Sequence, residues 1–106
     1  MKKITQTTIA QVVSEIVSAC KPHKVILFGS HGRGSPGKDS DIDLLIVADI
    51  AGASSERFRY VQRAITSKGF GIDTIVRTPE EFEKAMEGRD WFIQEIVKRG
   101  KVLYAR

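Results

Sequence analysis

Two aspartates separated by one residue are the first feature of this chain that could do chemistry. Asp41 and Asp43 flank Ile42 and are followed by the apolar run Leu44–Val47. If this segment is a β-strand, both carboxylates leave one face, with their Cα atoms roughly 7 Å apart. Carboxylates at this separation can converge on a hard divalent cation, and the apolar run would hold them rigidly in a sheet. The alternative is that the two acids only solvate the end of a strand.

A third carboxylate, Asp73, lies within a second apolar segment, residues 71–76. A carboxylate buried in an apolar strand costs free energy unless a cation or a metal compensates for it. If this strand lies beside the one that carries Asp41 and Asp43, all three acids share one face. The alternatives are a solvated aspartate at the strand edge and an ion pair with a nearby arginine: Arg57, Arg59 or Arg63.

A candidate phosphate cradle follows the apolar segment Lys24–Phe28. Gly29 and Ser30 come directly after it, and Arg33 stands three residues further on. Ligands of α/β sheets commonly bind beyond strand ends. Glycine permits close backbone approach, serine offers a hydroxyl and an N–H, and arginine offers a charge-assisted bidentate contact to phosphate. The alternative is an ordinary turn.

Two familiar glycine patterns in this loop are rejected. Residues 32–37 match G-x-G-x-x-G, and with Lys38 they also match the beginning of a P-loop. Both motifs require a helix directly afterwards, so that the phosphate meets the N-terminus of that helix, whereas residues 39–41 lead into the next strand. His31 is interpreted as a loop residue rather than a catalyst. The remaining set, three acids with a Gly/Ser/Arg cradle, suits an in-line phosphoryl or nucleotidyl displacement assisted by two metal ions.

The hydrophobic pattern predicts the elements that position these residues. Apolar runs indicate strands at residues 24–28, 42–48, 72–76 and 101–104. Helical spacing and capping signals indicate helices over residues 6–20, from a Ser54 or Ser55 cap to Lys68, from a Thr78 cap with Pro79 at its first position, and around residues 91–97. Residues 30–40 predict a loop with room for one helical turn. The nearly all-apolar strands require cover on both faces, as in an α/β layer.

Composition places these elements in a small, mildly basic chain. A length of 106 residues predicts one domain, residues 1–106. The net charge is +4, and residues 1–40 carry this surplus, which suits a phosphate-bearing ligand or an acidic partner. One cysteine excludes an internal disulfide, and no apolar run approaches the ~20 residues that cross a bilayer. We therefore expect a cytoplasmic protein without a membrane segment.

The motifs together resemble a known family. Residues 25–34, Val-Ile-Leu-Phe-Gly-Ser-His-Gly-Arg-Gly, and residues 40–44, Ser-Asp-Ile-Asp-Leu, are similar to the minimal nucleotidyltransferases (MNT) of the DNA polymerase β superfamily. The resemblance covers roughly residues 9–104 and implies the nucleotidyltransferase fold, a small mixed sheet flanked by helices in the α/β (α+β) class. Members often carry Arg and Ala where this chain has His31 and Gly32, so one positive charge is missing near the phosphates.

The resemblance also implies roles for the candidate residues. Gly29, Ser30 and Arg33 would bind the nucleoside triphosphate, and the three acids would be both the catalytic residues and the ligands of two Mg²⁺ ions: Asp41, Asp43 and Asp73. Asp73 would also help to activate the acceptor hydroxyl.

The implied activity is transfer of AMP from ATP to a hydroxyl of a partner protein. Larger relatives carry a second domain that binds the acceptor. Here we expect a partner protein to supply the acceptor. The implied partner is a HEPN-domain ribonuclease toxin modified on a tyrosine, which would make this protein an antitoxin, with no direct nucleic-acid binding. Two alternatives stay open: an antitoxin that acts by contact alone, and a nucleotidyltransferase of small molecules. Residues 89–97, where Trp91 and Phe92 are adjacent, are the candidate partner surface.

Overall fold

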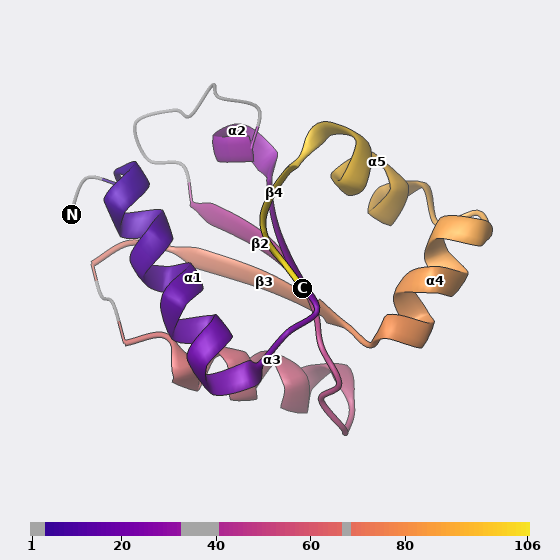
Figure 1. Cartoon of the computed structure of the whole chain (residues 1–106), viewed down its shortest axis with the longest axis horizontal. Helices are drawn as coiled ribbons and strands as arrows, with labels where there is room; N and C mark the ends of the chain where they lie inside the picture. The colour runs from indigo at the N-terminus through magenta and orange to yellow at the C-terminus, as the bar shows by residue number, and fades with distance from the viewer. Residues whose placement is uncertain (1–3, 33–40, 67–68) are drawn as a thin grey trace.

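The computed structural model describes residues 4–32, 41–66 and 69–106. Its elements follow the predicted order and are, along the chain, α1 (Gln6–Cys20), β1 (Lys24–Phe28), α2 (Gly29–Gly32), β2 (Ile42–Val47), α3 (Ser54–Ala64), β3 (Ile72–Arg77), α4 (Pro79–Glu87), α5 (Trp91–Arg99) and β4 (Lys101–Ala105) (Figure 1). The expected helical turn in the loop is α2, and residues 33–40 of that loop lie outside the described part of the chain.

The four strands form one mixed sheet in the order β3-β2-β1-β4. β1 runs antiparallel to both of its neighbours, β2 and β4, and β2 runs parallel to β3. The parallel pair is joined through α3, because antiparallel strands accept a short turn but parallel strands need a crossover. The predicted class, a small mixed sheet flanked by helices, is confirmed.

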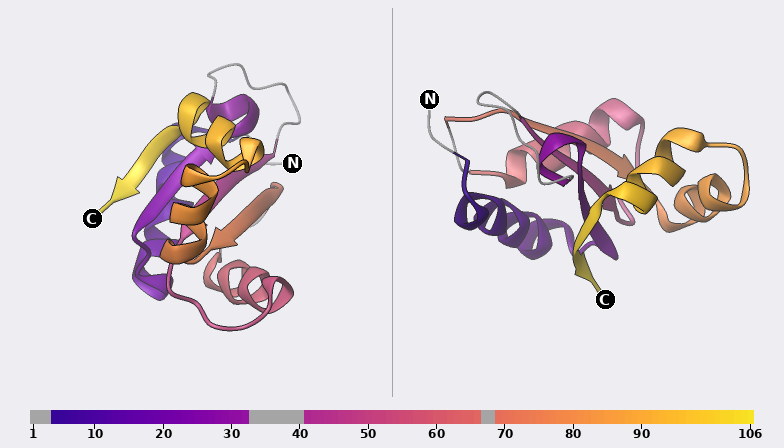
Figure 2. Two further views of the ribbon diagram at one scale, coloured as in Figure 1. Left: turned by 90° about the vertical axis from the view of Figure 1, so that its right-hand side faces the viewer. Right: turned by 90° about the horizontal axis from the view of Figure 1, so that it is seen from above.

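Helices cover both faces of the sheet, and two cores result (Figure 2). α1 and α3 pack on one face, where alternate residues of β2, Ile42, Leu44 and Ile46, are fully buried. α4 and α5 pack on the other face, over Ile26 and Leu45. We call these the first core and the second core. Each fully buried aliphatic side chain stabilises the fold by about 1.5–3 kcal/mol, so β2 is anchored from both sides.

The helix caps fit the sequence except at α3. Thr78 caps α4, with Pro79 at the first position, as predicted. The predicted Ser54 or Ser55 cap is wrong, because Ala53 is the N-cap and the Glu56 side chain accepts a hydrogen bond from the Ala53 N–H at 3.0 Å. This contact is the carboxylate half of a capping box, in which the side chain at the third helical position accepts from the N-cap N–H, and no side chain at the N-cap itself caps the helix.

The predicted end of this helix at Lys68 is also wrong. α3 stops at Ala64, and Ile65 takes an extended conformation. Ile65 is buried in the first core. Lys68 itself lies outside the described residues.

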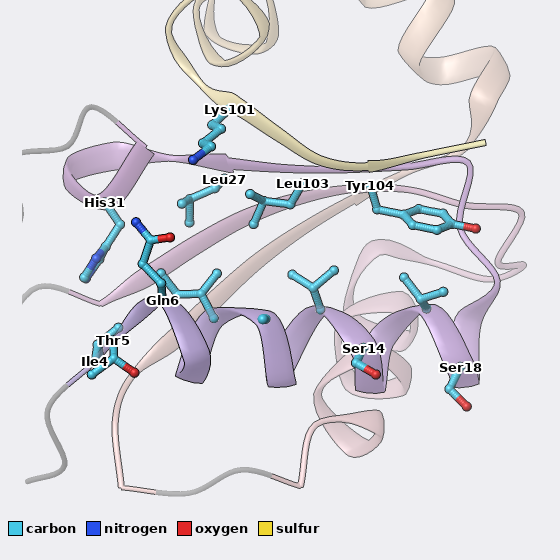
Figure 3. Close-up of a pocket in the computed structure, with 14 residues that line it drawn as sticks. Ile4, Thr5, Gln6, Ser14, Ser18, Leu27, His31, Lys101, Leu103 and Tyr104 are labelled. Carbon is cyan, nitrogen blue, oxygen red and sulfur yellow. The ribbon is translucent and has the colours of Figure 1, made fainter.

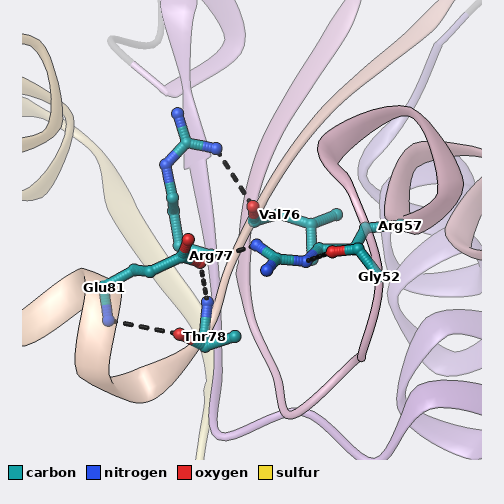
Figure 4. A network of polar contacts seen from close by, with 6 residues as sticks. All are labelled: Gly52, Arg57, Val76, Arg77, Thr78 and Glu81. Carbon is teal, nitrogen blue, oxygen red and sulfur yellow. Dashed lines mark hydrogen bonds and ion pairs between the residues drawn. The ribbon is translucent and has the colours of Figure 1, made fainter.

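A polar network ties α3 to the start of α4 (Figure 4). Glu81 accepts hydrogen bonds from the Thr78 N–H at 2.8 Å and from Arg57 at 2.6 Å, and Arg57 also donates to the Gly52 carbonyl at 3.0 Å. The hydrogen bonds that Glu81 accepts lower its pKa, and the bond from the Thr78 backbone has the largest effect. Arg57, considered above as a partner of Asp73, is therefore engaged with Glu81 instead.

Within the ranges that the structure describes, no helix is long and apolar enough to span a membrane.

Candidate active site at the ends of β2 and β3

Strand register brings two of the three acids side by side. β2 and β3 are parallel neighbours, with Asp43 directly opposite Asp73. Residues paired across a ladder point to the same side of a sheet, and on β2 that side is the one on which Leu45 enters the second core. The condition set by the sequence analysis, that the two strands are neighbours, is met, and Asp43 and Asp73 lie on one face of the sheet.

Asp41 joins them from the residue before β2. The Ile42 N–H donates to the Gly71 carbonyl at 3.0 Å, which joins the entrances of β2 and β3. The carboxylate of Asp41 lies so close to Gly71 that a Cβ added there would overlap it. We call Asp41, Asp43 and Asp73 the acidic cluster.

Gly29, the residue directly after β1, lies against the carboxylate of Asp43. Its φ is +69°, in the left-handed region that favours glycine. A Cβ added at Gly29 would overlap the carboxylate of Asp43. Glycine is the residue that accepts both the positive φ and the close approach, and it therefore lets the backbone after β1 contact the Asp43 carboxylate. Ser30 follows in α2; its side chain and the whole of Arg33 lie outside the described part of the structure.

The electrostatics link Asp43 to the other two acids. Partial burial raises the pKa of Asp43, the nearby charges of Asp73 and Asp41 raise it further, and the charge of His31 lowers it. Asp43 is half-buried, whereas Asp41 and Asp73 are exposed. A cation bound here would relieve this repulsion. His31, interpreted above as a loop residue rather than a catalyst, lies in α2, close enough to lower the pKa of Asp43.

The chemistry of the cluster fits a hard cation, because all its donors are carboxylate oxygens, which Mg²⁺ prefers. Among the described residues, however, no group of three or more His, Cys, Asp or Glu side chains is arranged so that it could hold an ion. Asp41 and Asp73 would therefore have to turn toward Asp43 to share an ion. The metal role of the acidic cluster stays a prediction.

Two aromatic rings, those of Phe28 and Phe92, lie next to the paired residues Asp73 and Asp43, on the β1 side. The sequence analysis did not predict this contact. Phe28 is opposite Asp43 on the antiparallel neighbour β1 and packs against the second core. The ring of Phe92, from α5, meets the ring of Phe28 edge-on, with 6.2 Å between centroids and 90° between planes. The adjacent aromatics of α5 were a signal in the sequence, but their contact with β1 depends on tertiary packing.

A groove of about 880 Å³ opens elsewhere, between α1 and β4 (Figure 3). Val13, Leu27 and Leu103 line it and belong to the first core or pack against it, on the opposite face of the sheet from Asp43 and Asp73. His31 lines one end of the groove, close to the start of α1. The groove is therefore separate from the acidic cluster, and α2 stands between the two.

Comparisons with known proteins identify the family to which this chain belongs. Residues 7–104 match the family described as "Nucleotidyltransferase domain". A protein of Methanocaldococcus jannaschii that carries the name "putative protein adenylyltransferase" is 34% identical over 105 residues, covering 89% of this chain and 96% of its own length.

Two solved structures share the fold. One, described as a "toxin-antitoxin with AMP-PNP", superposes with a TM-score of 0.68 at 19% identity, over 92% of this chain and 73% of that one. The other, described as a "putative nucleotidyltransferase from Sulfolobus solfataricus", has a TM-score of 0.61 at 25% identity, over 100% and 93% of the two chains. With a family match over nearly its whole length and a four-stranded sheet that carries three acids at one end, this chain belongs to the nucleotidyltransferase domain family and is an enzyme of that class.

Proposed function

We propose that this protein transfers AMP from ATP to a hydroxyl of a partner protein, with Mg²⁺ bound at the acidic cluster. The observation that carries the proposal is the register of β2 and β3, which sets Asp43 beside Asp73 with Asp41 at the same strand ends. The 34% identical relative named as a protein adenylyltransferase supports AMP as the transferred group and a protein as the acceptor.

In the proposed reaction an acceptor oxygen attacks the α-phosphorus of ATP. The new P–O bond forms as the bond from the α-phosphorus to the bridging oxygen breaks, and pyrophosphate leaves. Asp73 is the exposed member of the acidic pair, and we assign to it the orientation of the acceptor hydroxyl and the acceptance of its proton. Bound Mg²⁺ would supply charge stabilisation for the attacking and leaving oxygens. Asp41, Asp43 and Asp73 are the residues that would hold it.

Gly29, Ser30 and Arg33 are proposed to bind the triphosphate. Gly29 is the described member of this group, and its close approach to Asp43 supports a backbone cradle at the acidic cluster. The charge surplus of residues 1–40 is consistent with a phosphate-bearing ligand. We propose that residues 1–106 act as one nucleotidyltransferase domain, with the acceptor provided by another chain.

A ribonuclease toxin of the HEPN class is the partner that we propose, with this protein as its antitoxin. Support comes from the shared fold with a protein of a toxin–antitoxin structure that contains AMP-PNP. The proposed regulation is covalent: addition of AMP to the toxin would silence it. The competing hypothesis is an antitoxin that acts by contact alone.

Intact-mass measurement of the partner tests the transfer. The chain would be co-expressed with the protein of the neighbouring open reading frame, in parallel with the Asp41→Asn variant. We expect the partner to gain one or more AMP units with the wild-type chain and none with the variant. A stable complex whose partner gains no mass with either chain would contradict the enzymatic proposal and support contact alone.

A further inference from the structure

Helix α5 carries two adjacent aromatic residues that are largely exposed. Ile93 and Ile96 bury this helix in the second core. Trp91 and Phe92 remain 73% and 57% exposed. Single exposed hydrophobic side chains are common on protein surfaces, whereas contiguous apolar patches mark binding sites, and these two residues are adjacent at the first turn of α5.

Phe92 is held in place rather than free at the surface. Its ring meets the ring of the half-buried Phe28 edge-on, at 6.2 Å, which is the preferred geometry of an aromatic pair. Because Phe28 is fixed by β1 and by the second core, its contact sets the orientation of Phe92. Much of the Phe92 ring is left accessible to a ligand.

The position of this ring relates it to the acidic cluster. Phe28 lies opposite Asp43 in the ladder and directly precedes Gly29, whose backbone contacts the Asp43 carboxylate. Asp73, Asp43 and Phe28 therefore form a continuous row across β3, β2 and β1, and Phe92 extends that row toward α5. The site thus has a charged end and an aromatic end.

We propose that Phe92 is the nucleobase-stacking residue of this enzyme and that the aromatic end of the row binds the purine ring of the nucleotide. The inference rests on the proposed function, in which the phosphates lie at the acidic cluster. A nucleotide has the same division as the row, with its charge at one end and a flat π-system at the other. Stacking on one aromatic ring tolerates different bases and favours those with the larger π-surface, so Phe92 would favour purine over pyrimidine nucleotides without reading hydrogen-bonding groups.

Calorimetric titration with two probes isolates the base from the phosphates. The probes are AMP-PNP and inorganic tripolyphosphate, which has the phosphate chain but no base. For Phe92→Ala we expect the dissociation constant of AMP-PNP to rise by about 5- to 150-fold, which is the range for loss of one stacked base. The dissociation constant of tripolyphosphate should not change.

Three further variants distinguish ring stacking from a general apolar contact and from a loss of stability. Phe92→Leu keeps an apolar contact with Phe28 but has no ring, so it should lose AMP-PNP affinity like Phe92→Ala, whereas Phe92→Tyr should retain it. Phe58→Ala is the matched control, because it removes another exposed phenylalanine, 41% exposed, from α3. Thermal unfolding of each variant shows that the fold is retained.

Trp91, the only tryptophan in the chain, provides an independent signal. Its neighbour Phe92 would contact the base, so AMP-PNP should change the fluorescence of Trp91 and tripolyphosphate should not.

Several results would overturn the proposal. They are no binding of AMP-PNP by the wild-type chain, an unchanged AMP-PNP affinity in Phe92→Ala, or an equal loss for both probes. Weaker binding of the partner protein by this variant, with unchanged AMP-PNP affinity, would identify a protein-docking surface instead. The proposed transfer fails separately: if AMP-PNP binding depends on Phe92 but no partner gains AMP, the base site stands and the transfer proposal falls.

Discussion

Replacing Gly29 by alanine should damage the site more than it damages the fold. Gly29 has a φ of +69°, and the left-handed conformation costs an L-residue roughly 1–2 kcal/mol. The new Cβ would also overlap the Asp43 carboxylate, so Asp43 or the backbone after β1 must move. A displacement of about 1 Å at a reacting centre can lower a rate about 100-fold. We therefore expect a modest loss in the free energy of unfolding and a loss of about 100-fold in transfer rate.

Gly52→Ala is the matched control for this prediction. Gly52 also has a positive φ, +107°, and its added Cβ would meet the flexible side chain of Glu56 at 3.2 Å rather than an acid of the site. Its φ lies beyond the left-handed region that L-residues adopt, so the backbone strain of Gly52→Ala is at least as large as that of Gly29→Ala, but the substitution does not touch the acidic cluster. Urea unfolding measures the stability of both variants, and the initial rate of AMP incorporation into the partner measures their activity. Equal activity losses in the two variants would refute a specific role for the contact between Gly29 and Asp43.

The remaining predictions concern the acids, the phosphate cradle and acid stability. Asp73→Asn should spare more AMP-PNP affinity than Asp43→Asn while transfer is lost in both, which calorimetry and intact mass would check; equal losses of affinity would contradict the division of roles. Arg33→Ala should weaken AMP-PNP binding more than Ser30→Ala and reduce its salt dependence, because a charged contact is lost; titrations at two salt concentrations test this. The pKa of Glu81 is lowered in the folded state, so its stabilisation is present above the unfolded pKa and is lost as the pH falls through the folded pKa. Glu81→Gln should therefore flatten the acid side of the curve of unfolding free energy against pH.

Strand β2 and the start of α4 could be predicted because their signals are local. The apolar run after Asp43 is buried on both faces, as its composition indicates. Thr78 with Pro79 and Glu81 forms the predicted capping arrangement within four residues. The shared face of Asp43 and Asp73 was conditional on β2 and β3 being neighbours, and the parallel register satisfies that condition.

Most of the features that sequence reasoning missed depend on contacts between distant residues. The start of α3 is the exception, because Glu56 accepts a hydrogen bond from the Ala53 N–H only three residues away, where a serine cap was expected. At the other end of α3, Ile65 leaves the helix in an extended conformation and is buried in the first core. Arg57 pairs with Glu81, 24 residues further along the chain, rather than with Asp73. The contact of Phe92 with Phe28 joins α5 to β1 across most of the chain. The partners of Arg57 and Phe92 cannot be chosen from spacing alone, because each depends on how the helices pack on the sheet.

Binding of AMP-PNP with and without Mg²⁺ tests most directly whether the acidic cluster is the catalytic metal site. Calorimetry would compare the wild-type chain with a variant that carries both Asp41→Asn and Asp43→Asn, after thermal unfolding has shown that the variant folds. We predict binding that requires Mg²⁺ in the wild-type chain and is lost in the double variant. Undiminished Mg²⁺-dependent binding in the double variant would contradict the assignment of the site.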